Sequence, residues 1–573
     1  MRSLRAVLVT TAAVLMSLAA VGTQSASGAA NGQRSEIVAA TVVPSLYRAV
    51  AWSTSTTIGL EFNVAPRNPA ALASFISGVS TPGSAQYGRY LAKGNYASRF
   101  GATDATISTI THYLTAHGLS SVSASPDHLF VRARGSIRAV DALLHTSIRE
   151  YIYKGTHVYA NVTPAVVPTV LSRAVRTVLG LSTVPQFLAS YSIGRTVAHT
   201  SSDCSHMTKG INANSGPFTV AQLGSIYKFG AFATHGDLGQ GETMAIFELT
   251  NYLPGDIAHY RDCVSTNATI SGINVDGGGN VSISAEVEAD LDIEIAATLA
   301  PQANLQVYQG PNSEAGAVDT YQRIAVDDTA QVVSTSWGLC ERADRPAVTA
   351  ESAVFAEMAA QGQTVVAAAG DSGASDCLGL HATRANPLAG AIGVDDPASQ
   401  PFVTAVGGTT ITDASAIGTS PASQRVWNSS DLSGSGGGVS AVWPQPSYQA
   451  GVPGASASGR SVPDVSINAD PKSGYMIYSL GYGWIPVGGT SCGSPMVSSL
   501  LLLANEANAM RLGFVNPLLY HVGVHDPGVN FTDITQGNNE TYDVPGYSTA
   551  VVGFDAPSGW GTPIASSFVG GDI

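Results

Sequence analysis

Short, almost entirely apolar runs alternate with helical stretches through the second part of the chain. Four of these runs are predicted strands, at 243–249, 305–308, 331–336 and 364–369. Helical patterns at 285–299 and 347–361 lie between them. Continuous apolar runs are typical of parallel strands that are buried on both faces. The pattern therefore predicts an α/β domain with a parallel sheet, helices on both of its faces, and chemistry at the carboxyl ends of the strands.

The first part of the chain has a different pattern. Strand signals at 56–64 and 129–134 are mixed with helical signals at 69–79 and 136–144, which predicts a small α+β module. With 573 residues the chain exceeds what one hydrophobic core usually holds, so two folded parts are expected. Residues 186–205 are polar and irregular, and we predict a linker and processing region there.

The amino terminus has the pattern of a secretory signal peptide over residues 1–30. Arg2 and Arg5 precede an uncharged apolar stretch at 6–22, and small residues follow at 27–29. A retained membrane anchor is the alternative. No later stretch approaches the ~20 apolar residues of a membrane span. We therefore expect a secreted, extracellular protein that has no membrane contact after signal cleavage and is a monomer.

Charge divides the chain in two. Residues 31–199 carry 14 Lys+Arg and 6 Asp+Glu, whereas residues 200–573 carry 11 and 35, so the net charges are +8 and −24. Parts of opposite charge attract each other, and the acidic part would repel nucleic acid. Acid protonates carboxylates, so we expect the attraction to weaken at low pH.

Ser491 lies in a glycine-rich run, Gly488-Gly489-Thr490-Ser491-Cys492-Gly493-Ser494-Pro495, before an apolar stretch at 496–510. Glycines allow a sharp turn, and Pro495 suits the first turn of a following helix. A hydroxyl at a helix N-terminus lies where backbone N–H groups favour negative charge. Ser491 is therefore a candidate nucleophile that needs a base and an oxyanion partner elsewhere. A helix-capping serine is the alternative.

Three carboxylates are candidates for these partners. Glu288 and Asp292 are four residues apart, so they share one face of the predicted helix, where like charges repel. A shared proton, or a base held in place by its neighbour, would explain the pair. The alternative is a solvated acidic face. Asp371 follows the strand at 364–369 in a glycine-rich turn, where it could line a site or cap the turn.

A histidine base fits the sequence poorly. Of the 12 histidines, His235 alone precedes a glycine after the linker, and no suitable strand and Asp accompany it. The chain also has five cysteines without a Cys-x-x-Cys zinc spacing. Since Cys492 adjoins the candidate nucleophile, we expect it to be free and predict the pairs Cys204–Cys263 and Cys340–Cys377, although sequence alone cannot settle the connectivity.

Taken together, these motifs resemble the sedolisin family of kumamolisin-like serine-carboxyl peptidases. The resemblance includes Gly489-Thr490-Ser491, the run containing Glu288 and Asp292, and Gly370-Asp371-Ser372-Gly373. Further matching stretches are Ser336-Trp337-Gly338, Phe402 to Thr409, Gly436 to Ser440, and Val462 to Pro471. Residues 84–91 and 178–181 are similar to the activation prodomain of the family.

The resemblance implies a fold and a set of roles. It implies a subtilisin-like α/β peptidase domain at 206–573, preceded by a small α+β (ferredoxin-like) prodomain at 31–185 that inhibits it. The expected activity is that of an acid-active endopeptidase or tripeptidyl peptidase on peptides and proteins. The resemblance assigns Ser491 as nucleophile, Glu288 as base, Asp292 as the residue orienting Glu288, and Asp371 as oxyanion partner. Glu248 and Trp337 match positions near the site.

A calcium loop follows from the same resemblance. Its matching residues are Asp533, Ile534, Val551, Gly553 and Asp555, where carboxylates and backbone carbonyls suit a hard cation. Val551 replaces a glycine that is common in the family, and Cys492 replaces a small apolar residue. Surface aspartates are the alternative.

Two other functions remain open. The chain could be an inactive binding protein on a preserved sedolisin-like scaffold. It could also be a histidine-based subtilisin-like hydrolase that uses His235.

Overall fold

The structure is a computed structural model, and it describes most of the chain after residue 34. The described residues are 35–569 without 44–45, 52–53, 154, 195–202, 209–213, 280–282, 379–389, 416–421, 430–431, 545 and 547. The predicted signal peptide at 1–30 lies outside them. Within the described part, no helix has the length and apolar character that crossing a membrane requires.

The larger domain is built on an eight-stranded sheet. Its order is β14 (Thr269–Asn274), β15 (Asn304–Gln309), β13 (Thr243–Glu248), β16 (Val332–Thr335), β18 (Thr364–Ala368), β20 (Thr404–Asp413) and β21 (Ser423–Val426), and β24 (Val465–Asn468) also pairs with β20. All pairs are parallel except β20–β21. The four predicted strands are thus confirmed as β13, β15, β16 and β18.

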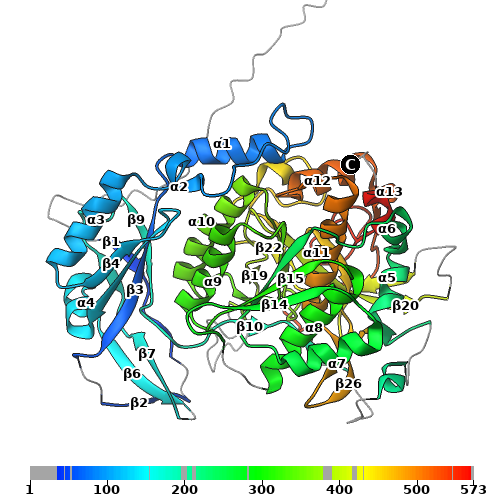
Figure 1. The fold of residues 1–573 in the computed structure, drawn as a ribbon, viewed down its shortest axis with the longest axis horizontal. Coiled ribbons are helices and arrows are strands. Elements are labelled where there is room, and N and C mark those ends of the chain that lie inside the picture. The colour runs from blue at the N-terminus through cyan, green and yellow to red at the C-terminus, as the bar shows by residue number, and fades with distance from the viewer. Residues whose placement is uncertain are drawn as a thin grey trace, which may run out of the picture.

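Helices cover both faces of this sheet, as predicted (Figure 1). One face packs against α8 (Ile283–Leu299) and α11 (Thr490–Ala507), and the other against α9 (Glu314–Asp327) and α10 (Arg345–Gln361). Successive side chains of a strand point to opposite faces. Met244 and Ile246 accordingly join the core with α8, whereas Ala245 and Phe247 join the core with α10.

The small N-terminal domain is a separate lobe, blue to cyan in Figure 1. Its main elements are β3 (Thr57–Val64), α1 (Pro69–Ser80), α2 (Tyr96–Arg99), α3 (Asp104–Ala116), β4 (Ser120–Ala124), β5 (Phe130–Ser136), α4 (Ile137–Leu144) and β9 (Val175–Leu179). The antiparallel order β4-β5-β3-β9 is that of a ferredoxin-like βαββαβ unit. The α+β fold and its predicted strands and helices are therefore confirmed.

Shorter elements complete both domains. The small domain adds β1 (Ser35–Val38), β2 (Arg48–Ala49), β6 (Ile148–Tyr153), β7 (Thr156–Asn161) and β8 (Ala165–Val167). The large domain adds β12 (Phe218–Thr219), α5 (Val220–Ile226), α6 (Gly230–His235), α7 (Pro254–Val264), β19 (Asp395–Asp396), β22 (Gly438–Val439), β23 (Ser461–Val462), β25 (Tyr475–Ser479), α12 (Asn516–His525), α13 (Pro527–Asn530), β27 (Phe531–Thr532) and β28 (Thr562–Pro563).

The small domain docks on the α9–α10 face of the sheet domain. Phe75 and Tyr96 share a hydrophobic core with Val354 and Phe355 of α10. The Leu91 N–H donates to the Ala360 carbonyl at 2.8 Å. Because this face is covered, α10 has no solvated polar side along most of its length.

Part of the predicted irregular linker is extended strand instead. β10 (Leu188–Ala189) pairs antiparallel with β17 (Trp337–Cys340), and β11 (Ser192–Ile193) pairs antiparallel with β26 (Gly483–Gly488). The linker thus contributes strands to two sheets of the large domain. The sequence did not indicate these strands, because their partners lie far away along the chain.

Both predicted disulfides are confirmed. Cys204 bonds Cys263 and Cys340 bonds Cys377, whereas Cys492 is free and buried.

Candidate active site

Ser491 is the second residue of α11, directly after a tight turn. Strand β26 ends at Gly488, and Gly489 caps the helix with φ +114°. A Cβ at Gly489 would lie 2.2 Å from the Ser190 carbonyl oxygen and 2.6 Å from Asp371 Oδ2. Only glycine therefore fits between these groups, in backbone space that other residues rarely adopt.

Pro495 is the sixth residue of this helix, so the expected first-turn position is wrong. Proline has no N–H, and its absence leaves the carbonyl of Ser491, four residues earlier, without its helical bond. The Ser336 hydroxyl lies 3.3 Å from that carbonyl and 2.9 Å from Asp292 Oδ1. Ser336 thus joins the start of α11 to a carboxyl of α8.

Glu288 and Asp292 are completely buried on α8, so the alternative of a solvated acidic face is wrong. Burial raises the pKa of Glu288 well above its usual value, the charges of Asp292 and Glu248 raise it further, and contact with Ser491 opposes the rise. Among the described atoms, neither the Ser491 hydroxyl nor the Glu288 carboxyl has a formed hydrogen bond. The two groups are therefore neighbours, and each can still form a hydrogen bond.

A third carboxyl belongs to this buried group. Glu248 ends β13, and the Trp337 indole N–H donates to its Oε2 at 2.9 Å. Burial raises the pKa of Glu248, and the charge of Asp292 raises it further. Carboxyls that interact this strongly titrate as a set rather than singly.

Asp371 follows β18 and faces the start of α11. Its Oδ1 accepts the Thr490 backbone N–H at 2.8 Å and the Thr490 hydroxyl at 2.9 Å. Its Oδ2 is buried and has no hydrogen bond among the described residues. Burial raises the pKa of Asp371 to about 7, against the lowering effect of the two Thr490 bonds. Asp371 therefore binds the turn that precedes Ser491, through Thr490, rather than capping its own turn.

The linker passes directly over this site. The Ser491 N–H donates to the Ser190 carbonyl at 3.0 Å, and the Ser190 N–H donates to the Ser336 carbonyl at 3.2 Å. The sequence analysis missed Ser190 and the bridging role of Ser336, since neither contact leaves a local signal.

His235 lies elsewhere. It ends α6 and contacts Asp237 Oδ2 at 2.6 Å. Nearby, the Gly239 N–H donates to the Glu506 carboxylate, which is fifteen residues beyond Ser491 on α11. At 1.5 Å per residue that is about 22 Å from Ser491. The geometry gives no support to a histidine-based site.

The predicted calcium ligands come together in the C-terminal part. The Gly553 N–H donates to Asp533 Oδ2 at 2.9 Å, and the Val551 N–H donates to Asp555 Oδ2 at 2.8 Å. Burial raises the pKa of Asp555 to about 6, and the charge of Asp533 adds to the rise. The described residues contain no group of three or more His, Cys, Asp or Glu side chains placed to hold a metal. A cation here would therefore depend on two carboxylates and on backbone carbonyls.

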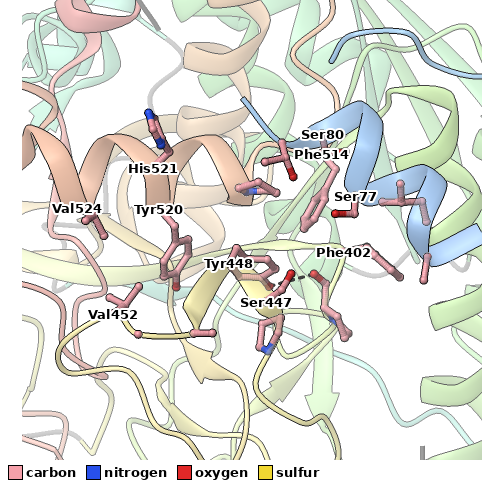
Figure 2. A pocket seen from close by; sticks show the side chains of 18 of the residues that line it. Ser77, Ser80, Phe402, Ser447, Tyr448, Val452, Phe514, Tyr520, His521 and Val524 are labelled. Atoms are coloured by element: carbon pink, nitrogen blue, oxygen red, sulfur yellow. Dashed lines mark hydrogen bonds between the residues drawn. The ribbon is translucent and has the colours of Figure 1, made fainter. Parts of the chain in front are cut away.

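A cavity of about 630 Å³ lies at the domain boundary instead of at the site (Figure 2). Ser77 and Ser80 of α1 line it on one side, and Tyr448 and Tyr520 on the other. None of the four candidate catalytic residues lines it.

Known proteins match both domains. The family described as "Pro-kumamolisin, activation domain" matches residues 46–184, and the Subtilase family matches residues 268–516. Kumamolisin from Bacillus sp. (strain MN-32) is 32% identical over 83% of this chain and 84% of its own length. Sedolisin from Pseudomonas sp. (strain 101) is 31% identical, with 87% and 84% covered. Tripeptidyl-peptidase 1 from Homo sapiens is 27% identical, with 88% and 90% covered.

Solved structures agree. Pseudomonas sedolisin, complexed with two molecules of pseudo-iodotyrostatin, matches with a TM-score of 0.55 and 26% identity. The match covers 61% of this chain and 96% of that one. With relatives matching the small domain and the sheet domain together, the chain belongs to the sedolisin family and is a serine peptidase with an N-terminal activation domain.

Proposed function

We propose that this chain is a secreted, acid-active serine-carboxyl peptidase that is made as a self-processing zymogen. In this proposal Ser491 is the nucleophile, Glu288 the general base, Asp292 the residue that positions Glu288, and Asp371 the oxyanion partner. The observation that carries it is the placement of Ser491 at a helix N-terminus between buried carboxyls, with a peptide carbonyl already bound beside it. The prodomain, linker and peptidase at 31–185, 186–205 and 206–573 are parts of the same proposal.

The chemistry follows from these positions. A substrate carbonyl oxygen that accepts the Ser491 N–H also lies near Asp371 Oδ2, which is free to donate when protonated. The Ser491 oxygen attacks the carbonyl carbon while Glu288 takes its proton, and the proton then goes to the leaving amine. Water hydrolyses the acyl-enzyme with Glu288 again as base. Asp292, held by Ser336, acts through Glu288.

Acid activity follows from Asp371. Its pKa of about 7 means that the protonated, donating form becomes more populated as pH falls through 7. The coupled set of Glu248, Glu288 and Asp292 must keep at least one negative charge to supply a base. Full protonation of this set removes activity at still lower pH, so we expect a bell-shaped profile with its alkaline limb set by Asp371.

The prodomain contact responds to acid in a way that net charge does not predict. Arg132 of the prodomain forms ion pairs with Asp319 on α9 of the peptidase domain and with Glu61 of the prodomain itself. Burial raises the pKa of Asp319 to about 8, Glu61 raises it further, and Arg132 opposes the rise. Of the two prodomain groups, Glu61 raises this pKa and Arg132 lowers it, so their charges act in opposite directions on the response of the contact to pH. The net charges of the two domains therefore do not by themselves set how this contact responds to acid, and in this proposal acid acts through the chemistry of the site.

Calcium is the cofactor that we propose for the C-terminal loop. Asp533 and Asp555 lie close enough for the charge of Asp533 to raise the pKa of Asp555 further, and a hard cation would relieve this repulsion. Asp533 and Asp555 would hold it with the carbonyls of Ile534, Val551 and Gly553. Bound calcium would stabilise the folded domain.

The alternative of an inactive binding protein has less support. An inactive scaffold has no need for a base, a positioning carboxyl and an oxyanion donor around one serine, yet all four side chains are present together.

The first prediction tests the catalytic set. Ser491→Ala and Glu288→Gln should each lower peptide hydrolysis by on the order of 10⁴ to 10⁶-fold, because these residues act as a unit. His235→Ala is the matched control and should retain parental activity. The measurement is mass-spectrometric digestion of a peptide library at several acid pH values, with circular dichroism to check folding. Near-parental hydrolysis by Ser491→Ala protein would reject the assignment.

The second prediction concerns Asp371 and pH. Asp371→Ala should lower kcat/KM by about 10²–10³, the cost of one oxyanion donor. Asp371→Asn should retain more activity, because an amide donates at every pH. The parental loss of activity as the pH rises through about 7 should be absent in Asp371→Asn, because the amide of Asn does not titrate. If the pH profile of Asp371→Asn keeps the parental alkaline limb, another group sets it.

The third prediction concerns calcium. In Ser491→Ala protein, which cannot digest itself, chelation or Asp555→Ala should lower the Tm by several degrees. A ligand at 100 times its Kd contributes about 2.7 kcal/mol to the free energy of unfolding. Asp526→Ala, at an exposed aspartate that caps no helix through its side chain, is the control. An identical Tm with and without chelator would count against the site.

A further inference from the structure

We propose that the maturation cut falls at the Ser190–Tyr191 peptide bond and that each molecule makes it in its own linker. The inference rests on the proposed function, because it takes Ser491 as the nucleophile. Beyond the proposed function, it names the bond that is cut, the strand register that holds this bond beside Ser491, and the intramolecular, first-order kinetics of the cut.

The Ser190 carbonyl occupies the position of a substrate carbonyl. Its oxygen accepts the N–H of Ser491 at 3.0 Å. The same oxygen and Asp371 Oδ2 lie 2.2 and 2.6 Å from the point where a Cβ of Gly489 would stand, and Tyr191 Cα is 2.6 Å from that point. Both residues of the bond therefore adjoin the turn before Ser491, and the oxygen is bonded to one donor of the proposed oxyanion site and lies near the other.

Strand pairing on both sides fixes the register. Upstream, Leu188 pairs with Gly338 and Ala189 with Trp337. Downstream, Ser192 pairs with Gly488 and Ile193 with Val487. A slip by one residue would reverse the direction of every side chain, so pairing at both ends opposes it. The linker thus lies across the site as an extended chain, with the bond between two anchored pairs.

Side-chain burial agrees with this register. Phe187 and Ser190 are buried, whereas Leu188 is 72% exposed. Tyr191 packs against the core that contains α8 and α11, and Ala189 packs against the core on the other face of the sheet. Tyr191 lies near the proposed base, since the charge of Glu288 adds to the effect of burial in raising its pKa. The phenol of Tyr191 therefore lies on the side of the site that holds Glu288.

The linker belongs to a prodomain that is docked on the same peptidase. The Gly180 N–H donates to Glu314 Oε2 at 3.1 Å, and the Gln186 amide donates to Asp344 Oδ2 at 3.0 Å. Downstream, Cys204 is tied to α7 through Cys263. The bond is thus held by its own molecule from both directions, so the cut is a first-order step.

The reaction balances within these groups and one water. The Ser491 oxygen bonds to the Ser190 carbonyl carbon, and its proton passes to Glu288. The bond to the Tyr191 nitrogen breaks, and Glu288 returns the proton to that nitrogen. Water then releases Ser190 as a new carboxyl terminus and restores Ser491, while Tyr191 becomes the new amino terminus.

The test acidifies purified full-length zymogen and identifies the earliest fragments by intact mass and amino-terminal sequencing. We expect a fragment that ends at Ser190 and a partner that begins at Tyr191. The rate constant should not change on about tenfold dilution. Added full-length Ser491→Ala protein should stay intact while the parent converts.

Tyr191→Pro tests the bond directly, because proline removes the cleavable secondary amide. This variant should lose the first cut, whereas Leu188→Ala, which changes an exposed side chain of the same segment, should be cut as the parent is. First fragments with ends elsewhere in a parent that hydrolyses added peptides would overturn the inference and leave the proposed function standing. A conversion rate that falls in proportion to dilution would overturn the intramolecular step. A parent that hydrolyses no added peptide would instead refute the proposed function.

Discussion

The packing of α8 against α11 is the contact on which the rest of the site depends. It places Glu288 and Asp292 of one helix beside Ser491 of the other, within a core that excludes water. Burial disfavours the charged form of a carboxyl, and neighbouring carboxyls raise one another's pKa. Burying these carboxyls lowers the stability of the fold, since none of the ion pairs among the described residues includes Glu288 or Asp292. In the proposed mechanism a carboxylate of this group serves as the base in acid, where a histidine would be protonated and idle.

Small residues then decide how closely the other groups approach. Because Gly489 has no Cβ, the Ser190 carbonyl oxygen and the Asp371 carboxyl can both lie against it. Pro495 frees the carbonyl of Ser491, and Ser336 takes that position while also holding Asp292. The turn, the helix and the strand that ends in Asp371 are therefore linked by a few short hydrogen bonds. A displacement of any one of them would move Asp371 and Ser491 together.

The prodomain combines two forms of restraint. It covers the α9–α10 face with apolar contacts, and its linker pairs with β17 and β26 on either side of Ser190. The opposite net charges of the two domains meet where Arg132 contacts Asp319. The interface also buries carboxyl groups, and burial raises the pKa of Asp319 to about 8 and that of Asp344 to about 6. Charge asymmetry along the sequence thus identifies which parts attract, but the burial of individual groups decides how the contact responds to pH.

Elements with a local sequence pattern were predicted correctly. Apolar runs predicted β13, β15, β16 and β18, and helical spacing placed Glu288 and Asp292 on one face of α8. The glycine-rich run before Ser491 marked a turn and a helix start, and the family motifs supplied the candidate roles. Cysteine positions led to the correct pairs, although the sequence left other pairings open.

Contacts between distant segments, in contrast, could be seen only in the folded chain. Nothing near residue 190 in the sequence indicates that the linker adds strands to β17 and β26, because those partners are about 150 and 300 residues away. From the helix pattern alone, Glu288 and Asp292 fitted a solvated acidic face better than a buried site, and only the fold shows that they are buried. Periodicity reports which side of an element is apolar, whereas pairing, burial and the resulting pKa values depend on segments that the chain brings together only when it folds.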